Sequence, residues 1–113
     1  MAMSVETEER AGWKVVHVAG EIDLRTAPEL RERLAVLLDE GADQVVLDLE
    51  KVTFIDSTAL SVMVGAHKRL VRQGTVLHLV STGLQVGRVL TVTGLFRVFA
   101  VHDTLDDAVG AAT

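Results

Sequence analysis

The feature that most constrains the fold is the segment Val52–Leu60, in which an apolar run stops abruptly at one acid and two hydroxyl residues. The first four residues of this segment are typical of a strand, and residues 57–72 carry apolar side chains at helical spacing. The pattern predicts a strand that leads directly into a helix, with Asp56, Ser57 and Thr58 at the junction. A helix N-terminus presents unpaired backbone N–H groups and the positive end of the helix dipole.

Ser57 has two alternative roles at such a junction. In the first role it caps the helix by accepting a hydrogen bond from a backbone N–H, and removing a cap of this kind costs about 1 kcal/mol of stability. In the second role it is a regulatory phosphate acceptor. A phosphate adds about −1.5 to −2 charges at neutral pH, and the donors of a helix N-terminus accommodate these charges without unfolding.

Turn residues divide the chain into alternating strands and helices. The alternation predicts a largely parallel sheet after an opening hairpin. We therefore expect one α/β domain over residues 1–113, with a mixed sheet of four to five strands and about four helices mainly on one sheet face. The expected strands are residues 4–9, 14–19, 44–49, 75–80 and 97–101, and the expected helices are residues 26–40, 57–72, 84–90 and one that begins after Asp103.

Three details of this pattern are specific enough to compare with a structure. Residues 52–55 either continue the strand 44–49 after a bulge or form a short separate piece. Thr26 and Glu29 have the spacing of a capping box, with Pro28 in the first turn, where its missing N–H costs little. The apolar stripe of the helix 57–72 is expected at Leu60, Met63, Val64, His67, Leu70 and Val71.

Composition excludes several classes of function. The chain has 113 residues, a net charge of −5 and no cysteine. Absence of cysteine excludes disulfides and thiolate chemistry, and the negative charge disfavours nucleic acid as a partner because phosphate backbones require clustered Lys and Arg. The acidic N-terminal segment does not have the pattern of a signal peptide, and the longest uncharged stretch, residues 74–87, is short for a membrane span. We expect a cytoplasmic protein.

The groups that converge on a catalytic centre are missing from the sequence. A nucleophilic serine needs a base within hydrogen-bonding reach and usually lies in a strained, glycine-flanked turn. Ser57 has no flanking glycine, and His67 lies ten residues on, which is about 15 Å along the same helix. No His or carboxylate cluster has the spacing of metal ligands. We expect a binding module without enzymatic activity, metal or cofactor, and a serine hydrolase is only a formal alternative.

Five short blocks of the sequence become specific through their order and spacing. The first two are Val18–Leu24 and Thr26–Leu30, and the next two are Val46–Leu49 and Val52–Leu60. The last block consists of Phe99–Val101 together with Thr104–Ala108. Taken together, over nearly the whole chain, these blocks resemble STAS-domain proteins of the bacterial anti-sigma factor antagonist family, whose signature is Asp-Ser-Ser/Thr-Gly/Ala-Leu.

The resemblance implies a partner-switching function. In such proteins the unphosphorylated antagonist binds an anti-sigma factor that is also a serine kinase, and binding releases a sigma factor for transcription. The kinase then phosphorylates the signature serine with ATP, the antagonist dissociates, and a serine phosphatase resets it. Ser57 matches the phosphate acceptor of the family. The resemblance places Asp23, Asp56, Thr58 and Ala59 with it in the partner-binding surface.

Two residues of the signature segment need comment. Ala59 replaces the commoner Gly, which matters little because Ala is the better helix former. Thr58 supplies a second hydroxyl, so it is a second candidate acceptor. The family also contains small scaffold subunits of transporter complexes and members of stress-sensing complexes. In a scaffold of that kind, Ser57 would be only a helix cap.

Overall fold

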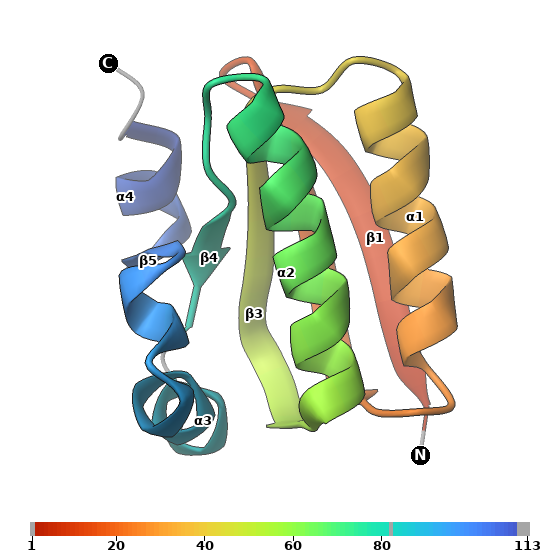
Figure 1. Ribbon diagram of the computed structural model, residues 1–113, viewed down its shortest axis with the longest axis vertical. Coiled ribbons are helices and arrows are strands. Elements are labelled where there is room, and N and C mark those ends of the chain that lie inside the picture. Colours follow the sequence, from red (N-terminus) through yellow and green to blue (C-terminus); the bar gives the residue numbers. More distant parts are fainter. Residues whose placement is uncertain (1, 82, 111–113) are drawn as a thin grey trace.

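The structure, a computed structural model, describes residues 2–81 and 83–110. From the second strand onward the chain alternates strand and helix (Figure 1). The strands are β1 (Met3–Arg10), β2 (Trp13–Ile22), β3 (Val45–Ile55), β4 (His78–Val80) and β5 (Ala100–His102), and the helices are α1 (Ala27–Asp39), α2 (Ser57–Arg72), α3 (Leu84–Thr93) and α4 (Leu105–Gly110). A 3-10 turn, Leu95–Arg97, follows α3.

The described strands form one five-stranded sheet in the order β1-β2-β3-β4-β5. The pair β1 and β2 is an antiparallel hairpin, and its turn residues Ala11 and Gly12 both have positive φ angles, as a type I′ hairpin turn requires. The remaining neighbours pair in parallel. The expected α/β fold, with an opening hairpin followed by parallel strands, is confirmed.

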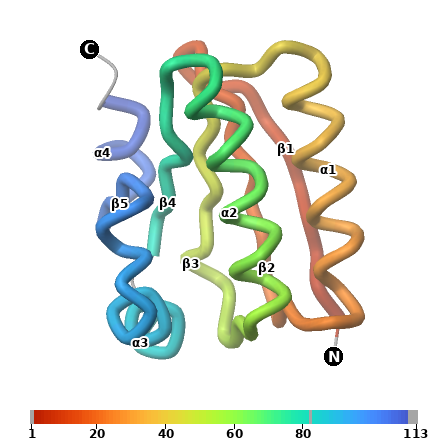
Figure 2. Tube along the Cα trace, viewed as in Figure 1, coloured from red at the N-terminus to blue at the C-terminus, as the bar shows by residue number. Residues whose placement is uncertain are grey.

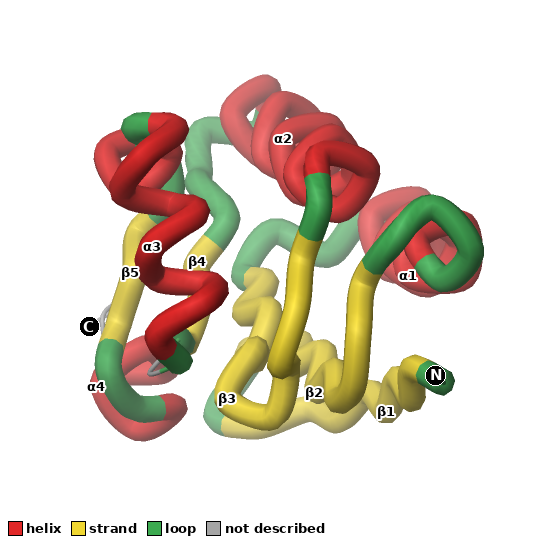
Figure 3. Tube along the Cα trace, turned by 90° about the horizontal axis from the view of Figure 1, so that it is seen from below, coloured by secondary structure: helices red, strands yellow, loops and turns green. Residues whose placement is uncertain are grey.

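The helices cover the two faces of the sheet unequally (Figure 3). Leu30 of α1, Met63 of α2 and Leu90 of α3 belong to one large core with the side chains of that sheet face. On the other face, Ala108 of α4 packs in a smaller cluster that includes Trp13. Because successive side chains of a strand point to opposite faces, β2 contributes to both clusters. The expectation that the helices lie mainly on one face is confirmed.

The boundaries of four strands differ from the expected ones by more than one residue. β2 continues three residues beyond the expected end, to Ile22. β3 is continuous from Val45 to Ile55, so residues 52–55 extend it, and the pairing with β2 shifts register along this extension. β4 and β5 are shorter than expected because each pairs with its inner neighbour over only three residues. The 3-10 turn occupies the start of the segment 97–101.

The parallel pairing places the ends of β2 and β3 at the same edge of the sheet. The loop that leads into α1, the first turn of α2 and α3 therefore gather at one end of the molecule, as Figures 1 and 2 both show. In open sheets with parallel strands, this edge is the usual place for a binding site.

Candidate functional site

The register of β2 and β3 brings Asp23 and Asp56 to the same edge of the sheet. Ile22 pairs with Ile55 at the ends of the two strands, and the backbone N–H of Asp56 donates a hydrogen bond to the carbonyl of Ile22 at 3.3 Å. The loop after β2 therefore lies beside the first turn of α2. Two residues that the resemblance places in one surface, 33 positions apart in the chain, are neighbours in the fold.

Asp23 organises the turn that leads into α1. Its Oδ1 atom accepts hydrogen bonds from the backbone N–H groups of Arg25 at 2.9 Å and Thr26 at 3.1 Å. These donors, Arg25 above all, hold the pKa of Asp23 below its ordinary value, so the side chain is an anion at neutral pH. The expected capping box of Thr26 and Glu29 does not form. Thr26 instead donates its hydroxyl to the carbonyl of Glu21 at 2.8 Å.

Asp56, and not Ser57, is the N-cap of α2. Its Oδ1 atom accepts hydrogen bonds from the backbone N–H groups of Thr58 at 2.9 Å and Ala59 at 3.1 Å. Of the two alternative roles of Ser57, the helix cap is filled by the acid one position earlier, which binds the N–H groups that a cap would satisfy. Ser57 is the first residue of the helix, and its side chain is exposed. Its hydroxyl makes no hydrogen bond to any described residue.

The two residues after Ser57 face increasingly toward the protein interior. Thr58 is half-buried, so its hydroxyl is less accessible than that of Ser57. Ala59 is fully buried under α2 and belongs to the main core. Its side chain is therefore not exposed at the surface in which the resemblance places it. A small residue is needed at position 59 because the helix approaches the core there.

Gln85 of α3 is a component of this edge that the sequence does not reveal. Its side-chain amide accepts a hydrogen bond from the backbone N–H of Ile55 at 3.0 Å and donates one to the carbonyl of Ile55 at 3.3 Å. α3 is thereby attached to the residue directly before the cap of α2. A single glutamine in an amphipathic helix resembles an ordinary solvent-facing residue, so no local pattern predicts this contact.

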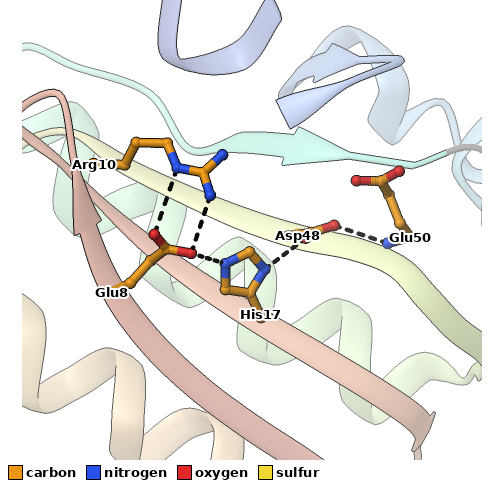
Figure 4. A network of polar contacts seen from close by, with 5 residues as sticks. All are labelled: Glu8, Arg10, His17, Asp48 and Glu50. Carbon is orange, nitrogen blue, oxygen red and sulfur yellow. Dashed lines mark hydrogen bonds and ion pairs between the residues drawn. The ribbon is translucent and has the colours of Figure 1, made fainter. Parts of the chain in front are cut away.

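A second polar cluster lies on the sheet face opposite the one that α1, α2 and α3 cover (Figure 4). His17 lies between Glu8 and Asp48, and its Nδ1 atom is 2.7 Å from a carboxylate oxygen of Asp48. Arg10 also contacts Glu8, and the backbone N–H of Glu50 donates to Asp48. Partial burial disfavours the charged ring, but the hydrogen bonds to the two carboxylates outweigh it and raise the pKa of His17. This cluster joins β1, β2 and β3 and does not contact the Ser57 edge.

Two further features of the described chain bear on function. Within residues 2–81 and 83–110, no group of three or more His, Cys, Asp or Glu side chains is arranged to hold a metal ion. In the same part of the chain, no helix has both the length and the apolar character that crossing a membrane demands.

Comparison with known proteins agrees with the fold and with the sequence blocks. The STAS domain matches residues 4–108. The anti-sigma-B factor antagonist of Staphylococcus aureus is 32% identical over 103 residues, which cover 91% of this chain and 95% of that protein. The crystal structure of an anti-sigma factor antagonist from Mycobacterium paratuberculosis has a TM-score of 0.91 at 32% identity and covers 97% of this chain and 93% of its own.

A more distant structure shows the same fold. The Bacillus cell fate determinant SpoIIAA, in its phosphorylated form, has a TM-score of 0.75 at 18% identity, covering 97% of this chain and 100% of its own. At that identity the likeness concerns the fold alone. The match to the STAS domain and the identity to a curated antagonist over nearly both full lengths establish the relationship. The chain belongs to the STAS-domain family of anti-sigma factor antagonists.

Proposed function

We propose that this chain is the switchable partner of an anti-sigma factor serine kinase. In the unphosphorylated state it binds the kinase through the edge formed by Asp23, Asp56 and Ser57, and a sigma factor is released. Phosphorylation of Ser57 by the kinase ends the binding, and a serine phosphatase restores it. The observation that carries the proposal is the position of Ser57, whose exposed hydroxyl is not needed for the helix cap.

The choice of Ser57 over Thr58 follows from access. A kinase must bring the γ-phosphate of ATP in line with the acceptor hydroxyl. Ser57 is exposed at the first position of α2, whereas Thr58 is half-buried. Ser57 is therefore the acceptor that needs no local unfolding.

The surrounding charges explain how phosphate would end the binding. A phosphate on Ser57 adds about −1.5 to −2 charges at neutral pH. The same edge already carries the carboxylates of Asp23 and Asp56, which are adjacent to the interstrand hydrogen bond between Ile22 and Asp56. A partner surface that accommodates two acids then faces two further charges and added bulk. The fold itself is expected to persist, because Asp56 remains available as the cap of α2.

The proposal is tested by isolating the tagged protein and its Ser57→Ala and Ser57→Asp variants from the native cells. We expect a soluble kinase to co-purify with wild type and Ser57→Ala, and not with Ser57→Asp. Mass spectrometry of the wild-type protein should locate phosphate on Ser57. Equal recovery of the kinase with Ser57→Asp would show that charge at this position is not the switch. Recovery of a membrane-bound ATPase complex with unmodified Ser57 would instead favour a scaffold subunit.

A further inference from the structure

A groove lies between α1 and α2 and opens on the side of these helices that faces away from the sheet. It has a volume of about 300 Å³ and is lined by residues of both helices. Its lower walls are apolar, because Leu34, Leu38, Val62 and Ala66 are buried there. Figure 3 shows the two helices side by side above the sheet. The other residues that line the groove are Arg31, Ala35, Ser61, Gly65 and Arg69.

Gly65 keeps the groove open. It lies in the interior of α2, where only Pro forms helix less readily than Gly. A Cβ atom at position 65 would meet nothing within 4 Å, and the residue does not have a positive φ angle. Neither a close backbone approach nor a left-handed conformation therefore requires glycine here. The structural consequence of the missing side chain is a deeper groove.

The groove carries positive charge although the chain has a net charge of −5. Arg31 of α1 and Arg69 of α2 line it, and no Asp or Glu does so. Arg69 is paired with Asp39 at 2.6 Å. The guanidinium of Arg31 has no ion-pair or hydrogen-bond partner among the described residues. An occupant that matches both properties presents an apolar side chain beside a carboxylate.

The groove is continuous with the candidate acceptor site. Ser61 lines it and lies one helical turn after Ser57, and the hydroxyl of Ser61 donates a hydrogen bond to the carbonyl of Ser57 at 3.1 Å. We infer that the groove binds an acidic, apolar segment of the same anti-sigma factor kinase, as a second contact that anchors it while Ser57 enters its active site. This inference rests on the proposed function and names the partner surface beyond the acceptor.

The test measures the dissociation constant of the purified kinase, identified by co-purification with the wild-type chain, for a set of matched variants. Gly65→Leu fills the groove and should weaken binding by about tenfold or more, as the loss of a central contact does. Arg31→Glu reverses an unpaired groove charge and should slow association and reduce its dependence on salt. Arg72→Glu makes the same charge change on α2 outside the groove and should leave binding nearly unchanged.

Thermal unfolding of the same proteins separates binding from folding. Gly65→Ala should raise the midpoint of thermal unfolding, because Ala is a better helix former and meets no neighbour at this position. This inference alone would be overturned if Ser57→Asp abolished kinase binding while Gly65→Leu and Arg31→Glu left it unchanged. Failure of any kinase to bind the wild-type chain would overturn the proposed function, and this inference with it. Binding of a free fatty acid in the groove with no effect on the kinase would also overturn it.

Discussion

The side-chain amide of Gln85 forms two hydrogen bonds with the backbone of Ile55, one as acceptor and one as donor. β4 pairs with β3 only at residues 46–48, so the last part of β3 has no neighbouring strand on that side. Gln85 provides the acceptor and the donor that a strand would have supplied. α3 thereby supports the end of β3 from which the cap of α2 and Ser57 project.

Replacing Gln85 with Leu should lower the free energy of unfolding by about 1–3 kcal/mol, because the N–H and C=O groups of buried Ile55 lose their partners. Gln85→Glu keeps an acceptor for the N–H but loses the donor to the C=O, so its loss should be intermediate. Urea unfolding of wild type, Gln85→Leu and Gln85→Glu measures the order of their stabilities. Equal stability of Gln85→Leu and wild type would indicate that water satisfies both groups.

Removing the Asp56 carboxylate should destabilise α2, whereas removing the Ser57 hydroxyl should not. Asp56→Ala loses an oxygen that accepts from two backbone N–H groups and should cost about 0.5–2 kcal/mol. Ser57→Ala loses a hydroxyl without a hydrogen bond and should change stability by less than about 0.5 kcal/mol. Thermal unfolding of both variants compares them directly, and a larger loss for Ser57→Ala would contradict the assignment of the cap.

Alanine at position 20 should disturb the pairing of β1 with β2. Gly20 has a φ of +98°, pairs with Met3, and a Cβ atom on it would overlap the carbonyl oxygen of Ala2. Gly41 has a similar φ of +93° but open space around the same position. Gly41→Ala should therefore show only the backbone strain of about 1–3 kcal/mol, and Gly20→Ala should lose more. Equal losses in urea unfolding would show that the start of β1 moves aside freely.

Local patterns predict much of this fold. The strand-to-helix change at Asp56 depends on the periodicity of adjacent residues and is visible in the sequence. The buried face of α2 is harder to predict. It includes Val62 and Ala66, whereas Val71 of the expected stripe is half exposed. Alanine carries a weak apolar signal, yet it allows the close approach of a helix to its neighbours.

Contacts between residues that are far apart in the sequence cannot be predicted from such local patterns. Gln85 and Ile55 are 30 positions apart, and His17 and Asp48 are 31 apart. Gln85 and Ile55 meet because α3 packs against the end of β3. His17 and Asp48 meet because β2 and β3 pair in one alignment, and a shift of one residue would move the side chain of His17 to the other sheet face. The position of Asp23 beside Asp56 has the same origin. It was accessible from the sequence only through the resemblance to a family.

The His17 cluster should make stability depend on pH in a defined direction. Because the pKa of His17 is raised, the stabilisation by its protonated ring is complete below the ordinary value of 6.5 and is lost as pH rises past the raised value. The hydrogen bond with His17 lowers the pKa of Glu8. The stabilisation by the Glu8 carboxylate is therefore present above pH 4.5 and is lost as pH falls. The stability difference between wild type and His17→Gln should be largest between about pH 4.5 and 6.5.

Urea unfolding at about pH 5.5 and pH 8 measures this difference, and it should shrink at the higher pH. His67 provides a control of opposite sign. Its Nδ1 atom accepts a hydrogen bond from the N–H of Leu77 at 3.2 Å, and burial lowers its pKa. The advantage of wild type over His67→Gln should therefore be present above pH 6.5 and decrease on acidification. The same pH trend in both variants would contradict the roles assigned to them.

The exposed leucines beside the Ser57 edge should contribute to kinase binding and not to folding. Leu24 follows Asp23 and is 72% exposed, and Leu84 precedes Gln85 and is 85% exposed. Replacing either with Ser should weaken binding by about 1–2 kcal/mol, roughly five- to thirtyfold, because the interface would lose a buried apolar side chain. Val92, 80% exposed at the other end of α3, is the matched control, and Val92→Ser should bind as wild type does. Titration calorimetry with the purified kinase measures all three, and equal effects of Leu84→Ser and Val92→Ser would place the interface away from this edge.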